Sequence, residues 1–289
     1  MEARGITPRD APLLLRTIEK DATDNGVGDA AGPAVGSSGT GRGGAQEPLA
    51  LPLWQAMLDA AVGPGTRVLD AGCGSGGASV CAARRGAHVN GLDAAEALVA
   101  IARRRLPNGD FGVGDLEALP YPDGTFDAIL VAEVLPYVAD PVAVLRELRR
   151  VCAWQGRVVV ATWGRPEECD QWAIEAAVRA VLPVPPDVER FALSRPSALE
   201  GLLAQAGLAV IGGGTVACPS EYPDAETLWL AQAAAGPLQA ALRVVGAEPL
   251  KAAVLRAVAP YRTSTGSVRL QNHFRYVVAT PHDDAPPTR

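Results

Sequence analysis

The feature that most constrains the fold is a glycine-rich loop between a short apolar run and a helical stretch. The apolar run is Arg67–Ala71, the loop follows it at residues 72–77, and the helical pattern covers Ala78–Arg85. Glycines in this position allow a tight turn and let a ligand approach the backbone closely. The order of strand and then helix recurs as far as Trp163. This alternation predicts an α/β domain with a parallel sheet and right-handed crossovers.

Hydrophobic periodicity predicts the remaining elements of the chain. Further strands are expected at His88–Asp93, Asp110–Gly114, Phe126–Ala132, Arg157–Trp163, Leu208–Cys218 and Leu270–Thr280. Helices are expected at Glu96–Arg105, Pro141–Cys152, Glu168–Leu182, Ser194–Gly207 and, with breaks, Asp224–Pro260.

Composition separates this folded part from its flanks. Residues 24–47 are rich in Gly, Ala and Ser, and such a segment buries too little apolar surface to offset its ordering entropy. We expect residues 1–47 to be a flexible segment with one short helix at Pro8–Asp21. The main domain is expected at 48–280, and a disordered tail at 281–289.

Charge and cysteine content narrow the possible partners and compartment. The formal net charge is −6 and aromatic residues make up 5% of the chain, which disfavours nucleic acid and anionic membrane surfaces as partners. The five cysteines are an odd number and form no C-x-x-C pair, so neither a disulfide framework nor a zinc site is expected. No apolar stretch is long enough for a membrane span and the first residues lack a signal-peptide pattern. These features predict a cytoplasmic protein, either a monomer or a homodimer.

The glycine loop alone is compatible with two ligands. Gly72, Gly74 and Gly77 satisfy the dinucleotide pattern G-x-G-x-x-G, which is a weak signal by itself. Asp70 lies just before the loop, where a carboxylate would repel a pyrophosphate and attract a cation. Asp93 ends the next strand about 20 residues later, the spacing of an acid that binds a ribose. These residues favour a ligand with a ribose, a positive group and no phosphate, such as S-adenosylmethionine.

Four segments in order resemble the class I S-adenosylmethionine-dependent methyltransferases, especially the branch of ubiquinone and menaquinone biosynthesis. They are VLDAGCGSGG from Val68, GLDAAEAL around Asp93, GDLEALPY from Gly114, and FDAIL from Phe126, which runs into Val134-Leu135 and is followed by LRELRRV. The resemblance implies a Rossmann-like, seven-stranded sheet whose last strand is antiparallel and lies between strands five and six. In such a fold, the segment Pro219–Val268 between the last two strands is far longer than a hairpin needs. We expect it to be a helical substrate lid.

The resemblance also implies the residues that hold the cofactor. Asp93 would accept the ribose hydroxyls with Ala94 beside it, although Ala94-Ala95 stand where the family often has small hydroxyl residues. The other expected cofactor residues are Asp70, Gly72, Cys73, Gly74 and Gly76 at the amino-acid end, Asp115 and Leu116 at the adenine, and Ala132 and Glu133 at the methionine side. Each acid has a simpler alternative role as a helix cap, and Glu133 could simply be solvated.

An antiparallel last strand brings its beginning to the ligand edge of the sheet, together with Trp163-Gly164 and Cys218–Tyr222. His273 is therefore the leading candidate for a general base, with packing within the sheet as its alternative. Glu221, Tyr222 and Tyr137 are the other candidates. Glu133 is the lone acid of its loop, so we expect no metal ion.

Together these features predict a methyltransferase that acts on a small, partly apolar molecule, in specialised (natural-product) metabolism. Three alternatives remain open at this point. They are a methyltransferase of RNA or protein, an NAD-dependent oxidoreductase, and a cofactor-binding protein without catalytic activity.

Overall fold

The computed structural model describes residues 47–184, 189–234 and 236–282. The predicted helix Pro8–Asp21, the rest of the N-terminal segment to residue 46, and the predicted tail from residue 283 lie outside these residues.

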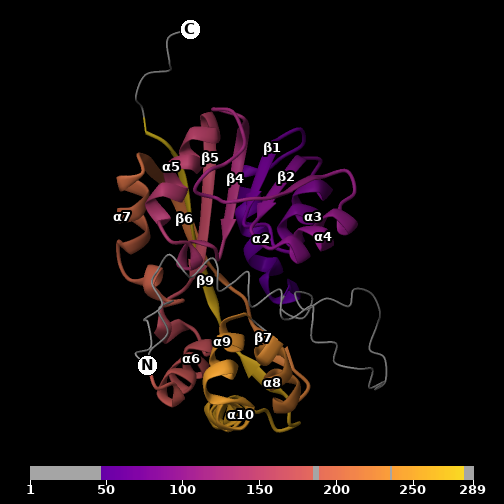
Figure 1. Cartoon of the computed structure of the whole chain (residues 1–289), viewed down its shortest axis with the longest axis vertical. Coiled ribbons are helices and arrows are strands. Elements are labelled where there is room, and N and C mark those ends of the chain that lie inside the picture. The colour runs from indigo at the N-terminus through magenta and orange to yellow at the C-terminus, as the bar shows by residue number, and fades with distance from the viewer. Residues whose placement is uncertain (1–46, 185–188, 235, 283–289) are drawn as a thin grey trace, which may run out of the picture.

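One seven-stranded sheet forms the centre of the described chain (Figure 1), with the strand order β3-β2-β1-β4-β5-β9-β6. Strands β1 to β5 are parallel neighbours, whereas β9 is antiparallel to both β5 and β6. The expected α/β fold with an antiparallel last strand between strands five and six is confirmed. The strands are β1 (Arg67–Ala71), β2 (His88–Asp93), β3 (Asp110–Val113), β4 (Phe126–Ala132), β5 (Cys152–Trp163), β6 (Leu208–Ala217) and β9 (His273–Pro281).

Helices cover both faces of this sheet because successive residues of the central strands point to opposite sides. Leu69 and Ile129 pack toward α5 (Pro141–Val151) and α7 (Ala198–Gln205). Their neighbours Val68 and Leu130 belong to the core on the other face. That core also includes side chains of α2 (Glu47–Ala61), α3 (Gly77–Arg84) and α4 (Glu96–Arg105).

A second, smaller body lies at the carboxyl ends of the parallel strands, in the lower part of Figure 1. We call it the cap. Its core is a separate cluster of buried side chains, including Leu228, Leu250 and Val254. Ile174 and Val178 of α6 belong to the same cluster, so α6, which precedes the predicted lid in sequence, is part of the cap. The cap consists of α6 (Gln171–Val181), β7 (Ser220–Tyr222), α8 (Ala225–Ala234), α9 (Gly236–Val245), α10 (Ala247–Ala257) and β8 (Val268–Leu270).

Three predicted elements differ clearly from the structure. The strand expected from Arg157 begins at Cys152. The helix expected from Ser194 begins at Ala198, because Ser194 lies in a short 3-10 turn (η4, Ala192–Ser194) and its hydroxyl donates to the carbonyl of Phe191 at 2.7 Å. The strand expected at Leu270–Thr280 is interrupted at Gln271 and Asn272. The amide of Gln271 donates to Asp170 at 2.6 Å instead of to a neighbouring strand, so the chain leaves the β7–β8 ribbon before it enters β9.

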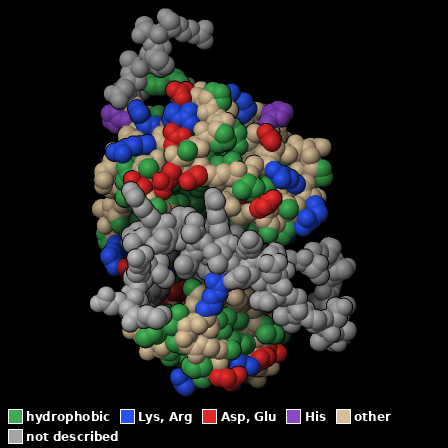
Figure 2. Space-filling view, viewed as in Figure 1, with side chains coloured by type: hydrophobic (Ala, Val, Ile, Leu, Met, Phe, Trp, Pro, Cys, Tyr) green, Lys and Arg blue, Asp and Glu red, His purple; other side chains and the backbone are tan. Residues whose placement is uncertain are grey.

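Charged side chains of both signs are interspersed on the face shown in Figure 2. None of the described helices is long and apolar enough to cross a membrane.

Candidate functional site

The glycine loop turns sharply between β1 and α3. Gly72, Gly74 and Gly76 have φ angles of +77°, +52° and +82°, a backbone region that residues other than glycine rarely adopt. The amides of Gly72 and Cys73 both donate to the carbonyl of Leu92, at 2.8 and 3.1 Å. The loop is therefore fixed to the end of β2, next to Asp93.

Asp93 joins the loop to the next helix. Its Oδ2 accepts from the amide of Gly74 at 2.8 Å, and its Oδ1 accepts from the amide of Ala95 at 2.9 Å. The bond to Ala95 closes a turn before α4, whose N-cap is Ala95 without a side-chain cap bond, so Asp93 does not cap this helix as the alternative supposed. A carboxylate offers about four acceptor positions, so Asp93 retains capacity for two hydroxyl groups. Burial raises its pKa, and interactions with the backbone amides of Ala95, Gly74 and Ala94 oppose that shift.

Asp70 is buried at the end of β1. The Ser79 hydroxyl of α3 donates to its Oδ2 at 2.6 Å. Burial raises the pKa of Asp70 to about 6, and the nearby charge of Asp93 adds to the increase. Two carboxyl groups thus lie beside one glycine loop, an arrangement that favours a cationic ligand. The sequence analysis did not identify Ser79, although its position in the first turn of the helix after the loop could have suggested it.

Asp115 and Leu116 begin the loop between β3 and β4. Asp115 is exposed and accepts from the amide of Glu117 at 2.9 Å, whereas Leu116 is buried. Arg150 of α5 holds the rest of this loop, since its guanidinium donates to the carbonyls of Leu119 and Tyr121 at 3.0 and 2.7 Å. This contact gives the LRELRRV motif a structural role, because its last arginine positions the loop that carries Asp115.

The expected meeting of three chain segments at one edge of the sheet is observed. The amide of Gly164 donates to the carbonyl of His273 at 2.7 Å, and the amide of Cys218 donates to that of Asn272 at 2.7 Å. The Nδ1 atom of His273 lies 2.9 Å from the carbonyl oxygen of Glu168. A carbonyl can only accept, so Nδ1 carries the proton and Nε2 is the basic nitrogen.

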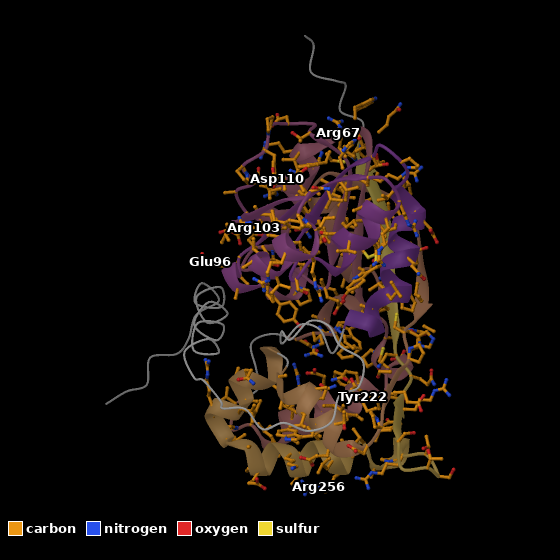
Figure 3. The ribbon with its side chains drawn as sticks, turned by 90° about the vertical axis from the view of Figure 1, so that its right-hand side faces the viewer. Arg67, Glu96, Arg103, Asp110, Tyr222 and Arg256 are labelled. Carbon is orange, nitrogen blue, oxygen red and sulfur yellow. The ribbon has the colours of Figure 1, made fainter. Side chains whose placement is uncertain are left out.

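Two candidate bases lie in the cap instead. Tyr222 belongs to the cap core, and its hydroxyl interacts with Ser220 and Gln232. Figure 3 shows it in the cap half of the molecule, apart from Glu96 and Arg103 of α4. Glu221 is on the exposed side of the β7 strand, 3.4 Å from the hydroxyl of Ser267.

A charged cluster that the sequence analysis missed surrounds the other candidate, Tyr137. Arg190 has a side chain that is 14% exposed and pairs with Glu175 at 3.1 Å. It also donates to the Tyr137 hydroxyl, and its guanidinium carbon lies 5.6 Å from the centre of the Trp163 ring. Glu133 lies close enough for Arg190 to affect its titration. We call Glu133, Tyr137, Glu175 and Arg190 the Arg190 cluster.

Among the residues that the structure describes, no group of three or more His, Cys, Asp or Glu side chains is arranged to hold a metal ion. The expectation that no metal takes part stays a prediction.

Comparisons with known proteins agree with the geometry of the glycine loop. Residues 69–160 match the family described as "Methyltransferase domain". The chain is 38% identical over 115 residues to a demethylmenaquinone methyltransferase of Renibacterium salmoninarum, covering 39% of this chain and 48% of that protein. It is 35% identical over 153 residues to a ubiquinone biosynthesis O-methyltransferase of Xylella fastidiosa, covering 50% and 61%. The chain thus spans about half the length of the first curated relatives that it matches.

Solved structures show the same fold over a larger part of the chain. The YcgJ protein of Bacillus subtilis has a TM-score of 0.54 at 19% identity, covering 80% of this chain and 98% of that chain. The [4+2]-cyclase SpnF has a TM-score of 0.54 at 19% identity, covering 98% and 100%. At such identities the likeness concerns the fold alone. The family match covers the glycine loop and Asp93: residues 69–160 match a methyltransferase domain, and over this part the resemblance to the S-adenosylmethionine-dependent methyltransferases of quinone biosynthesis is confirmed.

Proposed function

We propose that the protein transfers the methyl group of S-adenosylmethionine to a small, partly apolar acceptor in specialised metabolism. The observation that carries the proposal is the position of Asp93, which is bonded to the glycine loop and retains acceptor capacity for two ribose hydroxyls.

The residues around the loop fit this cofactor. A Cβ atom added at Gly74 would meet no atom within 4 Å, so a ligand has access to the backbone beside Asp93. Asp70 and Asp93 together provide negative charge next to that opening. In this proposal Asp70 and the backbone of the loop hold the amino-acid end, Asp93 holds the ribose, and Asp115 with Leu116 holds the adenine.

The bound cofactor supplies a methyl group that is already activated by its sulfonium. The protein therefore mainly has to align the acceptor with the methyl group and exclude water. The cap lies at the carboxyl ends of the parallel strands, where ligands of open α/β sheets bind. Its separate core, outside the matched residues 69–160, supports the proposal that it selects the acceptor.

The proposal can be tested with cofactor labelled in the methyl group and a host metabolite extract. We expect label in the low-molecular-mass fraction with the wild-type protein and with Asp59→Ala, a control whose side chain is 73% exposed. We expect Asp93→Ala to reduce that labelling strongly. Label found only in protein or RNA would overturn the assignment to a small acceptor.

A further inference from the structure

Ser79 of α3 contacts the carboxyl group of Asp70, at the point where β1 leads into the glycine loop. Ser79 is fully buried, and Asp70 is 3% exposed. The Ser79 hydroxyl donates to Oδ2 of Asp70 at 2.6 Å, a distance typical of a hydrogen bond to a charged oxygen. Such a bond stabilises the carboxylate relative to the neutral acid.

The backbone of α3 stabilises the same carboxylate. The helix begins at Gly77, so Ser79 is its third residue, and its amide is one of the first four that lack an acceptor within the helix. The residue before the helix, Gly76, has no side chain that could accept this bond. The Ser79 amide interacts with the carboxylate of Asp70 instead. A carboxylate offers about four acceptor positions, so Asp70 retains capacity for a further donor.

The nearby acidic group acts against the charge of Asp70. Asp93 of β2 and Cys73 of the loop are titratable groups close to it, since both carboxylates raise the pKa of the Cys73 thiol. Burial raises the pKa of Asp70 to about 6, Asp93 adds to this increase, and the hydroxyl and amide of Ser79 oppose it. Loss of the Ser79 hydroxyl would therefore favour the neutral form of Asp70 near neutral pH.

The amino-acid end of S-adenosylmethionine carries the charge that this arrangement calls for. Its ammonium group donates hydrogen bonds and is attracted to a carboxylate, whereas a neutral carboxyl group offers it no opposite charge. The adenosine part of the cofactor has no charge near neutral pH. Only the amino-acid end should therefore be sensitive to the ionisation of Asp70.

We propose that Ser79 is a positioning residue for the cofactor, because it orients the Asp70 carboxylate and keeps it as the anion that receives the ammonium group of S-adenosylmethionine. This proposal rests on the proposed function and deepens it, since it gives a role in cofactor recognition to a residue outside the glycine motif. Ser79 acts through Asp70 and not by contact with the cofactor. Recognition of the ammonium group should weaken when Asp70 takes up a proton, and Ser79 sets the pH at which this happens.

The test compares S-adenosylhomocysteine with its deamino analogue, which lacks only the ammonium group. Titration calorimetry on the full-length protein gives the ratio of the two affinities from about pH 5.5 to about pH 7.5, where an α-amino group keeps its proton. We expect the wild-type protein to prefer S-adenosylhomocysteine by at least about tenfold at the upper end of this range. The preference should begin to fall near pH 6, where Asp70 takes up a proton. Effects on the adenosine part cancel in the ratio.

Ser79→Ala should move the onset of this fall to higher pH. The expected shift is about one to two pH units, the size that corresponds to a lost hydrogen bond to a charged group. Asp70→Asn should reduce the preference and make it nearly independent of pH. Adding Ser79→Ala to Asp70→Asn should then have no further effect on the preference, because Ser79 acts through the Asp70 carboxylate.

Ser194→Ala is the matched control. Ser194 is also buried, and its hydroxyl donates to the carbonyl of Phe191 at 2.7 Å. The variant therefore loses a comparable hydrogen bond, but away from the glycine loop. We expect it to keep the wild-type onset. An equal shift in Ser194→Ala and Ser79→Ala would show that the loss of any buried hydroxyl has this effect, and it would overturn the proposal.

The remaining outcomes are also decisive. An unchanged onset in Ser79→Ala would overturn the role of Ser79. A wild-type preference that is absent or independent of pH would show that Asp70 does not receive the ammonium group, while binding of S-adenosylhomocysteine itself would leave the methyltransferase proposal intact. Failure of S-adenosylhomocysteine to bind at any pH would overturn the proposed function, and this proposal with it. If Asp70→Asn does not fold, the comparison of Ser79→Ala with Ser194→Ala still decides the question.

Discussion

At the scale of single residues, two glycines of one loop differ in their surroundings. A Cβ atom at Gly72 would lie 2.4 Å from Cγ2 of Val134, whereas one at Gly74 would meet nothing within 4 Å. Both residues have positive φ angles, +77° and +52°, so both substitutions carry the backbone cost of about 1–2 kcal/mol.

The comparison of Gly72→Ala with Gly74→Ala isolates the steric contribution. We expect Gly72→Ala to lower the free energy of unfolding by about 2–5 kcal/mol, because overpacking adds about 1–3 kcal/mol to the backbone cost. Gly74→Ala should lower it by only about 1–2 kcal/mol. Urea unfolding of the two variants measures the difference, and equal losses would show that Val134 adapts to the added methyl group.

The sequence alone can indicate a candidate site residue when the strand pattern fixes where that residue lies. Asp70 and Asp93 could be found because each ends a strand beside the glycine loop, so their positions follow from the strand pattern. Arg190 could not be found in this way. Its contacts come from Tyr137, Trp163 and Glu175, which lie on three different elements, and no local spacing relates them to residue 190.

At the scale of elements, β1, β2 and β4 were predicted with correct bounds, whereas β5 begins at Cys152 and not at Arg157 as predicted. β4 is a continuous apolar run, and turn residues bound β1 and β2, so the sequence pattern defines where these strands begin and end. Elements fixed by tertiary contacts were predicted less well. Residues 271 and 272 look like part of one strand, but hydrogen bonds to Asp170 and Gln171 turn the chain there. The inclusion of α6 in the cap depends on packing of Ile174 and Val178, which periodicity alone does not reveal.

The cap should unfold locally when its core is weakened. Leu250 on α10 is fully buried in the cap core, so Leu250→Ala should remove about 2–5 kcal/mol of local stability. We expect faster hydrogen exchange in α6, α8 and α10, with S-adenosylhomocysteine affinity and exchange in β1 and β4 unchanged. Val244→Ala, at a side chain that is 61% exposed on α9, is the control. Faster exchange throughout the sheet would show that the cap and the sheet unfold as one unit.

At the scale of the whole molecule, burial of Glu133 predicts how stability depends on pH. Its pKa is raised from 4.5 to about 8 in the folded chain. Between pH 6 and 8 the folded protein therefore holds a proton that the unfolded chain has released. The stability linked to this proton is present in full below about pH 4.5 and is lost as the pH rises through about 8.

As the pH rises toward the folded pKa, the free energy of unfolding should fall by about 1.4 kcal/mol for each pH unit. From pH 6 to pH 8 the loss should be roughly 2–3 kcal/mol. Urea unfolding at several pH values measures it, and Glu133→Gln should remove most of the slope in this range. Asp70, with a pKa of about 6, has the same sign but contributes mainly below pH 6. An unchanged slope in Glu133→Gln would mean that Glu133 is already ionised in the folded protein at pH 6.

The central claim, that the glycine loop and Asp93 bind S-adenosylmethionine, is tested most directly by titration calorimetry with S-adenosylhomocysteine. We expect binding by the wild-type protein, no measurable binding of NADH, and a loss of about 1.5–3 kcal/mol in Asp93→Ala from the missing charge-assisted hydrogen bonds. Asp59→Ala should bind like the wild type, and circular dichroism should confirm that Asp93→Ala is folded. Unchanged affinity in a folded Asp93→Ala protein, or NADH binding as tight as that of S-adenosylhomocysteine, would contradict the account.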